Sequence, residues 1–232
     1  MIRVTAEPMA FPTPMVAEVA RATPARGRLA YAAAKRALDV AVALTLLVLL
    51  LPLLALVSLA IVLDSPGRVF YRGERVGRFG ERFTVLKFRS MCANADAGTH
   101  AQFVRSLLHD ASACTVYKVP NDGRITRVGA VLRRTSLDEL PQLWNVLRGE
   151  MSLVGPRPDV PYAAAEYEPW MRQRLDVKPG ITGLWQVSGR SRLSLLDMYR
   201  LDSAYAEDAS LLLDLRILVR TVPAVLRADG AA

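Results

Sequence analysis

Three groups of side chains suited to phosphate chemistry lie within one short stretch of the sequence, Leu132–Pro158. The stretch contains an arginine pair, the adjacent carboxylates Asp138 and Glu139, and Arg157 between two prolines. An ionised carboxylate can attack a phosphorus atom when nearby cations stabilise the charge that develops on the phosphate oxygens. The pattern therefore indicates phosphoryl-transfer chemistry. A plain helix N-terminus with solubilising surface charges fits the same residues and stays open as the alternative.

The apolar periodicity after Ser136 predicts a helix, and the start of that helix decides where Asp138 lies. If Ser136 is the N-cap residue, Glu139 falls at position N3 and completes a capping box. If Asp138 is the N-cap residue, Pro141 falls at N3, inside the first turn that tolerates proline. We prefer the second start, because a proline at N5 would remove a helical hydrogen bond. In both cases the helix dipole favours an ionised Asp138 and attracts phosphate.

The composition points to anionic partners. The chain has 232 residues, a net charge of +8 and a pI of about 9.9, which suits phosphorylated substrates, nucleic acid or an acidic membrane surface. We predict no nucleic-acid partner, because no recognised fold motif or aromatic platform accompanies the arginines. The two cysteines and two histidines lack the spacing of a disulfide framework or a zinc site.

The N-terminal quarter of the sequence predicts a tail followed by a membrane segment. Residues 1–30 are rich in Ala, Pro and Arg without sustained periodicity, so we predict a mobile tail. Val40–Leu63 is a run of 24 residues without a charge. As a straight helix it would extend about 36 Å, enough to cross a bilayer. We therefore predict that this run inserts into a membrane.

The topology of this run depends on Pro52 and on the charges at its two ends. Basic residues precede and follow the run, so the positive-inside rule does not choose an orientation. Pro52 lies in the middle, where it removes a backbone hydrogen bond and bends a helix. Together these features favour a re-entrant helix, break and helix with both ends in the cytoplasm. A kinked transmembrane span is the alternative.

The next segment predicts a β-hairpin. Two β-favouring runs, Val69–Arg72 and Arg82–Phe88, flank a segment with three glycines. Lys87 and Arg89 end the second run and are candidate phosphate ligands, although exposed basic pairs of this kind are often only surface charge.

The remaining chain predicts further helices and one glycine-rich loop. Val177–Arg190 contains three glycines, and its backbone can approach a ligand closely. Trp185 in this loop would stack on a base or a sugar, or pack in the core. Leu211–Leu226 fits an interfacial amphipathic helix and a core helix equally well. We predict three other helices, at Ala93–Val119, Val160–Leu175 and Leu195–Tyr205.

Several separated motifs then occur in a recognisable order: KRALDV, an apolar run with a central proline, DSPGRVFYRGERVGRFGERFTVLKFRSM, RRTSLDELPQLWNVLRGEMSLVGPRP and KPGITGLWQVSGR. Over about Lys35 to Val222 the chain resembles the bacterial sugar transferase family, the monotopic phosphoglycosyl transferases, in their compact catalytic-core form. The resemblance implies an α+β fold that is mainly helical. It places a re-entrant membrane helix-break-helix, a short β-hairpin and interfacial amphipathic helices around a compact catalytic core. The expected parts are a tail at 1–30, an anchor at 31–66 broken at Pro52, and a catalytic domain at 67–232.

The resemblance also implies an enzyme and its reaction. The expected reaction moves a hexose-1-phosphate from a UDP-sugar, with glucose or galactose favoured, to undecaprenyl phosphate and releases UMP. The implied mechanism is ping-pong through a phosphosugar intermediate on Asp138, as the first membrane step of exopolysaccharide or related glycan synthesis. One alternative is the same reaction with a UDP-N-acetylamino sugar, for O-antigen or glycoprotein assembly. Another is a catalytically silent membrane scaffold.

The resemblance assigns roles to residues and names partners. Glu139, with Asp138, would hold Mg²⁺. The segment Pro156, Arg157 and Pro158 would bind phosphate through the guanidinium group. The other basic residues expected near the diphosphate are Lys87, Arg133 and, more weakly, Arg89. The expected location is the bacterial inner membrane, with the active site on its cytoplasmic face. The expected partners are the two substrates, inner-membrane lipids, downstream glycosyltransferases and a second copy of the chain.

Overall fold

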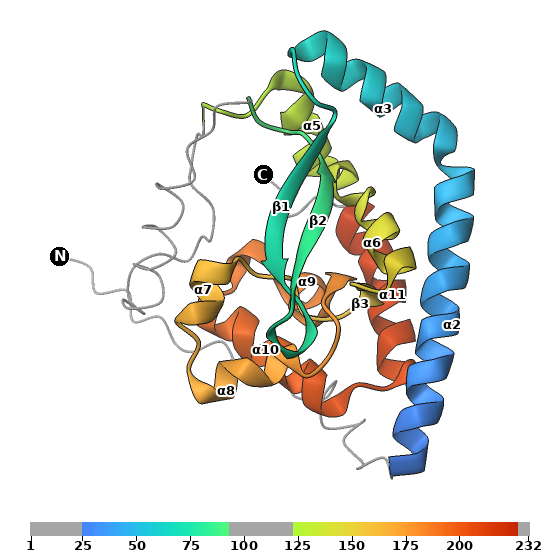
Figure 1. Cartoon of the computed structure of the whole chain (residues 1–232), viewed down its shortest axis with the longest axis vertical. Helices are drawn as coiled ribbons and strands as arrows, with labels where there is room; N and C mark the ends of the chain where they lie inside the picture. The colour runs from blue at the N-terminus through green and yellow to red at the C-terminus, as the bar shows by residue number, and fades with distance from the viewer. Residues whose placement is uncertain (1–24, 93–122, 227–232) are drawn as a thin grey trace, which may run out of the picture.

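The structure, a computed structural model, describes residues 25–92 and 123–226 (Figure 1). It is mainly helical, with one antiparallel and one parallel two-stranded sheet. In chain order the elements before the gap are α2 (Ala25–Leu49), α3 (Leu51–Asp64), β1 (Phe70–Val76), η1 (Arg78–Gly80) and β2 (Arg82–Phe88). After it come α5 (Arg127–Thr135), η2 (Leu137–Glu139), α6 (Gln142–Arg148), β3 (Ser152–Val154), α7 (Pro161–Ala165), α8 (Pro169–Arg172), η3 (Gln173–Leu175), β4 (Gly180–Thr182), α9 (Leu184–Ser188), η4 (Arg190–Arg192), α10 (Leu195–Asp208) and α11 (Leu211–Leu226).

The apolar run forms two helices that meet at a sharp bend. Figure 1 shows α2 along one side of the molecule and α3 turning across its top; the two are bent by 63°. Pro52 lies in the first turn of α3, where it has no N–H to donate to a carbonyl of the preceding turn. In the described ranges no single helix is long and apolar enough to cross a membrane; this bent pair together satisfies the length and composition that a broken span or a re-entrant loop requires.

The start of α2 corrects one predicted boundary. Residues 25–30, which we assigned to the tail, form the first turns of this helix. The segment Ala25–Leu49 is rich in alanine, leucine and arginine, which are strong helix formers, and this explains the earlier start. Residues 1–24 lie outside the described part, so the mobile tail stays a prediction there.

We expect Pro52→Ala to straighten the α2–α3 pair, because alanine restores the missing backbone donor. The measurement is membrane-impermeant thiol labelling in inverted and intact vesicles, with cysteines placed at Ala33 and Arg68 and both native cysteines replaced by serine. In the parent chain both ends should label from one face. In Pro52→Ala, a fraction of the molecules should have their two cysteines labelled from opposite faces of the membrane. The control Ala55→Ser, on the same helix, should not change the labelling pattern. Unchanged labelling of Pro52→Ala would show that the proline does not determine the bend.

The predicted hairpin is confirmed. β1 and β2 pair antiparallel along their whole length, from Phe70 opposite Phe88 to Val76 opposite Arg82. The fully buried Asn145 on α6 connects the hairpin to the core. Its side-chain carbonyl accepts the backbone N–H of Leu86 (3.0 Å) and its amide donates to the carbonyl of Thr84 (2.7 Å). This amide fixes β2, and with it Lys87, against α6.

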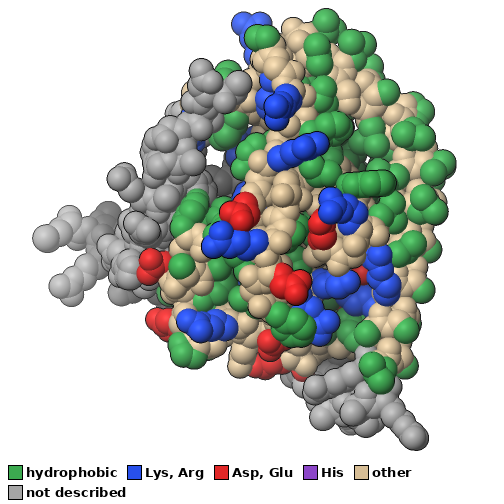
Figure 2. All heavy atoms as spheres, viewed as in Figure 1, with side chains coloured by type: hydrophobic (Ala, Val, Ile, Leu, Met, Phe, Trp, Pro, Cys, Tyr) green, Lys and Arg blue, Asp and Glu red, His purple; other side chains and the backbone are tan. Residues whose placement is uncertain are grey.

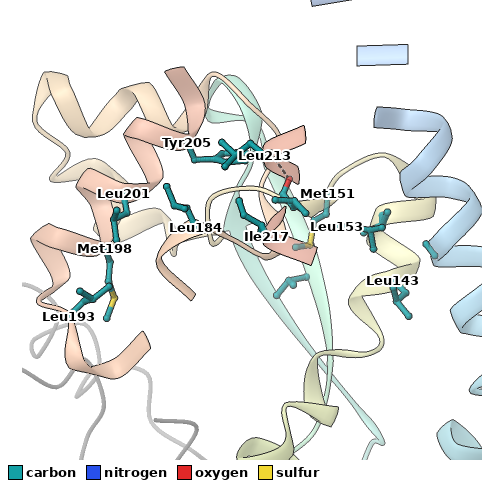
Figure 3. Packing of buried hydrophobic residues seen from close by; sticks show 14 residues of the cluster. Leu143, Met151, Leu153, Leu184, Leu193, Met198, Leu201, Tyr205, Leu213 and Ile217 are labelled. Carbon is teal, nitrogen blue, oxygen red and sulfur yellow. Dashed lines mark hydrogen bonds between the residues drawn. The ribbon is translucent and has the colours of Figure 1, made fainter. Parts of the chain in front are cut away.

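The core gathers around β3, α9, α10 and α11 (Figure 3). Figure 3 shows Leu184, Tyr205, Leu213 and Ile217 converging on Met151 and Leu153. The helix α11 has the core role that the sequence allowed, while its interfacial role stays a prediction. One face is buried in this core, and the opposite face exposes large apolar side chains, among them Val219 and Val222.

Two other predictions need correction, and one lies outside the described residues. Val160–Leu175 is not one helix, because Pro169 begins a new helix after extended backbone at Glu168. Val177–Arg190 is not an open loop: it contains β4 and α9. In this segment Gly180 packs against the backbone of Gly155 rather than against a ligand. A Cβ on Gly180 would lie 2.1 Å from the amide nitrogen of Gly155. The helix expected at Ala93–Val119 falls outside the described ranges.

Candidate active site

The turn that carries Asp138 and Glu139 lies between α5 and α6. Ser136 adopts a left-handed conformation (φ 59°, ψ 16°) that ends α5, and Leu137–Glu139 then form the single 3-10 turn η2. The next helix, α6, begins at Gln142 after Pro141. Both predicted helix starts are therefore wrong, because neither Ser136 nor Asp138 is the N-cap residue of α6. The left-handed serine and the proline set the two carboxylates apart from both helices.

Two cations from distant segments hold Glu139. The Lys87 ammonium, on β2, donates to Glu139 Oε1 at 2.8 Å. The Arg157 guanidinium, after β3, donates to the same oxygen at 2.8 Å. The side chains of Glu139 and Lys87 are only 14% and 18% exposed. These charge-assisted contacts bring the hairpin, the η2 turn and the Pro-Arg-Pro segment to one point.

The electrostatics of this triad keep Glu139 charged. Burial by itself raises the pKa of Glu139, but Arg157 and Lys87 outweigh burial and hold this pKa well below its usual range. Burial lowers the pKa of Lys87, and the charge of Glu139 opposes that shift. Glu139 is consequently a fixed anion at neutral pH, with Lys87 and Arg157 as its counter-charges.

Asp138 differs from its neighbour. Burial raises the pKa of Asp138; Lys87, Arg157 and Arg133 act in the opposite direction, while Glu139 adds to the rise. The result is a carboxylate that is more basic than an ordinary aspartate and lies among three cationic side chains. A basic carboxylate next to cations that can bind phosphate oxygens is suited to nucleophilic attack on phosphorus.

The other predicted candidates divide into two groups. Arg133 lies on α5 close enough to influence Asp138, and its buried Nη1 has no hydrogen-bond partner in the described ranges. Arg89 lies elsewhere: it is buried and donates to the carbonyls of Pro66 (2.8 Å) and Ser65 (2.6 Å). Arg89 thus satisfies carbonyl groups just after α3. Pro156 and Pro158 flank Arg157, and the carbonyl of Pro156 accepts the backbone N–H of Gly180 at 2.8 Å.

A buried ionic network behind Arg157 was missed by the sequence reasoning. Arg174 is 4% exposed and contacts the carboxylates of Asp159 and Asp202, while its Nη2 donates to the backbone carbonyl of Arg157 at 2.8 Å. Tyr199 donates to Asp159. One sequence signal was available: Asp202 lies on the apolar stripe of α10, between Met198 and Tyr205. A carboxylate on such a stripe requires a buried partner.

Comparison with known proteins decides the family. The model of the family described as bacterial sugar transferase matches residues 30–228, which is most of the chain.

The chain belongs to the bacterial sugar transferase family.

Three relatives of this sugar transferase illustrate the family. The UDP-galactose-lipid carrier transferase of Erwinia amylovora is 45% identical over 197 residues, covering 85% of this chain and 41% of the relative. The exopolysaccharide production protein ExoY of Sinorhizobium fredii is 42% identical over 197 residues, covering 85% of this chain and 87% of the relative. The UDP-glucose:undecaprenyl-phosphate glucose-1-phosphate transferase of Caulobacter vibrioides is 42% identical over 205 residues, covering 85% and 71%.

These comparisons confirm the resemblance read from the motifs. The chain spans 41% of the Erwinia relative and 87% of ExoY. The family match at residues 30–228 includes the paired carboxylates and the Pro-Arg-Pro motif.

The donor set of this sugar transferase is compatible with Mg²⁺. The described residues contain no group of three or more His, Cys, Asp or Glu side chains arranged to hold a metal ion. Mg²⁺ is typically bound by one or two protein carboxylates, with water and substrate phosphates completing its coordination. Asp138 and Glu139 supply those two carboxylates, so the residues fit an ion that binds together with a diphosphate substrate.

We expect the charge of Glu139 to make the stability of this sugar transferase depend on acid pH. Its pKa is lower in the folded chain than the usual 4.5, so its ion pairs contribute stability above about pH 4.5 and lose it as pH falls further. Glu139→Gln should lower the unfolding temperature at neutral pH and flatten its decline below about pH 4.5. Scanning fluorimetry in detergent measures both effects, with the exposed Glu81→Gln as control. An equally steep acid decline in Glu139→Gln would contradict the assignment.

Proposed function

We propose that this chain transfers a hexose-1-phosphate from a UDP-hexose to undecaprenyl phosphate, as the first membrane step of exopolysaccharide synthesis. The observation that carries the proposal is the convergence of Lys87 and Arg157 on Glu139, the residue next to Asp138. Burial also raises the pKa of Asp138, which fits a nucleophilic carboxylate. The family supports the same reaction class, since its members include transferases named for UDP-galactose, UDP-glucose and undecaprenyl phosphate.

The proposed chemistry has two displacement steps. In the first, an Asp138 oxygen attacks the β-phosphorus of the UDP-sugar. The bond from that phosphorus to the bridging oxygen breaks, and UMP leaves with the electron pair. In the second, a phosphate oxygen of the lipid attacks the phosphorus of the Asp138 phosphosugar. The bond from that phosphorus to Asp138 breaks, which regenerates the carboxylate and yields the sugar diphospholipid. Each half of this ping-pong sequence forms one P–O bond and breaks one.

The surrounding cations have distinct roles in this proposal. Arg157 and Lys87 bind the diphosphate oxygens on which charge accumulates as UMP leaves. Arg133 approaches the same region from α5, and its buried unpartnered Nη1 is available to an oxygen of the substrate. Arg89 is not included, because backbone carbonyls at the end of α3 accept its hydrogen bonds. Glu139 orients Lys87 and Arg157 before the substrate binds.

Mg²⁺ is part of the proposal, with Glu139 and Asp138 as its protein ligands. When bound, the ion supplies positive charge to the diphosphate and to the departing UMP. Glu139 would then contact this ion as well as Lys87 and Arg157, and these two cations already hold its pKa low, so that its carboxylate is ionised before the ion binds.

The donor is proposed to be UDP-glucose or UDP-galactose. A small surface depression of about 40 Å³ adjoins Arg157 and is lined on its other sides by Trp185, Met198 and Tyr199. An indole beside a cationic side chain offers a stacking surface for a sugar or a base. A UDP-N-acetylamino sugar is the alternative donor, and the panel experiment below distinguishes the two.

The exposed apolar surface supports a placement at the membrane. Figure 2 shows apolar side chains along the edge formed by α2 and α3. On α3, Leu56, Leu59 and Leu63 are each more than half exposed. We propose that the bent pair enters the cytoplasmic leaflet of the inner membrane and returns, which leaves Asp138 at the height of lipid phosphate groups. A soluble sugar nucleotide and a long lipid can then meet at one site.

The decisive experiment is UMP release by the full chain in nanodiscs. Each UDP-sugar of a panel is offered with Mg²⁺ and undecaprenyl phosphate, and Asp138→Asn is the matched control. We expect lipid-dependent UMP release from UDP-glucose or UDP-galactose and none from the variant. Release from an N-acetylated donor alone would correct the sugar. No release from any donor by a folded sample would overturn the transferase proposal and favour a scaffold.

A further inference from the structure

The first half of α2 is attached to the catalytic core by charged side chains. The basic residues in KRALD, before the apolar run, were interpreted from the sequence as a membrane flank. In the fold, the Arg36 guanidinium instead lies at the C-terminal end of α6. Its Nη1 donates to the carbonyl of Val146 (2.6 Å) and its Nη2 to the carbonyl of Leu147 (2.8 Å). These carbonyls belong to the last turn of α6, where a helix has unsatisfied acceptors. The other end of α6 follows the turn that carries Asp138 and Glu139.

Asp39 makes a second attachment three residues further along α2. Its carboxylate is 4% exposed, and Oδ1 accepts hydrogen bonds from the Ser152 hydroxyl (3.1 Å) and the Leu153 backbone N–H (3.0 Å). Both donors lie on β3, the strand that leads into the Pro-Arg-Pro segment. One helix of the proposed anchor therefore binds both chain segments that carry the acidic pair and Arg157.

A third attachment joins α2 to α11. The Lys35 ammonium lies 2.9 Å from Asp214 Oδ2, and the Tyr31 hydroxyl donates to the same oxygen at 3.0 Å. Asp214 is 1% exposed, and its Oδ1 accepts a hydrogen bond from Tyr205 at 2.6 Å. Tyr31, Lys35 and Asp39 are spaced four residues apart, so they form one stripe on the helix.

The exposed apolar surface begins directly beyond this stripe. Leu44, Val48 and Leu49 are each more than half exposed, and α3 follows. Along a helix, Leu49 lies about 15 Å from Asp39. Three attachments fix α2 on the core. The distance from the exposed apolar surface to Glu139 and Arg157 is therefore fixed as well. A buried ion pair of this kind is costly to form and by itself is weak evidence for a stabilising role.

We propose that Lys35, Arg36 and Asp39 are positioning residues that hold the active site at a set height above the membrane, so that the lipid phosphate meets Asp138. This inference rests on the proposed function. The inner geometry of the site has its own supports, because Asn145 connects α6 to β2 and Arg174 holds the Arg157 backbone. Loosening α2 should consequently impair the step that uses the lipid and spare the step that uses the UDP-sugar.

The test separates the two half-reactions in nanodiscs. We expect Arg36→Met and Asp39→Asn to form the phosphosugar adduct, measured as a UMP burst without lipid, within about twofold of the parent rate. Transfer of the adduct to undecaprenyl phosphate should fall about tenfold, as expected for lost charge-assisted hydrogen bonds. The controls are Arg68→Met, which removes an exposed charge from the other flank, and Ala37→Ser on the exposed side of α2; both should transfer normally. If Arg36→Met fails to fold, Arg36→Lys is used instead. It keeps the positive charge and removes the paired geometry of the two guanidinium hydrogen bonds.

A second readout does not depend on activity. Spin labels at Thr45→Cys on α2 and Thr84→Cys on β2, in a chain without native cysteines, report the distance between anchor and core. The parent should give one narrow distribution, and Arg36→Met and Asp39→Asn broader ones. Narrow distributions in these variants, or an equal loss in both half-reactions, would overturn the positioning role. If the parent itself releases no UMP while the variants still broaden the distribution, the proposed function fails and the docking of α2 stands.

Discussion

Asp138→Asn is expected to abolish turnover and the covalent phosphosugar adduct, with a loss of about a thousandfold or more. The amide has the shape of the carboxylate but lacks the charge and basicity needed to attack phosphorus. Glu139 keeps its two contacts with Lys87 and Arg157 in this variant, so the fold around the turn should not change. The measurement is single-turnover UMP release together with intact-protein mass spectrometry after incubation with the UDP-sugar.

The controls for this prediction address folding and reversion. Thermal unfolding in detergent should be close to that of the parent chain, because Asp138 bears a raised pKa and gives little stability as an anion. Asp138→Ala, which cannot revert by deamidation, should be equally inactive. An adduct that still forms in either variant would assign the nucleophile to another residue and leave Asp138 with a binding role.

Arg174→Met is expected to be the most destabilising single change, by about 3–5 kcal/mol. The guanidinium is nearly fully buried between the carboxylates of Asp159 and Asp202. Its removal leaves two buried carboxylates without a counter-charge. It also removes the donor to the Arg157 carbonyl, so the KM for the UDP-sugar should rise. Chemical denaturation in detergent and steady-state kinetics measure the two effects.

Two further variants decide whether the charge of Arg174 is the cause. Arg172→Met, a neighbouring exposed arginine, should change stability by less than about 0.5 kcal/mol. Arg174→Met combined with Asp159→Asn and Asp202→Asn should be more stable than Arg174→Met alone, because no unpaired charge remains. A triple variant as unstable as the single one would show that packing, rather than unpaired charge, explains the loss.

The sequence alone was sufficient for features that local patterns determine. The uncharged run with its central proline predicted a broken apolar helix, because a proline has no backbone donor wherever it lies. Two β-favouring runs and the glycines between them predicted the hairpin with Lys87 near its end. The ordered motifs predicted the family. These features depend on neighbours in the chain, and so they are visible before folding.

The tertiary structure decided how the charged residues are used. Asp138 and Glu139 lie in a 3-10 turn rather than at a helix N-cap, because Ser136 and Pro141 interrupt the chain on both sides. Arg89 satisfies carbonyl groups after α3, although it is two residues from Lys87 in the site. The basic pair before the apolar run attaches α2 to the core. A charged side chain takes its role from the partner that reaches it across the fold, and sequence spacing does not specify partners more than a hundred residues away.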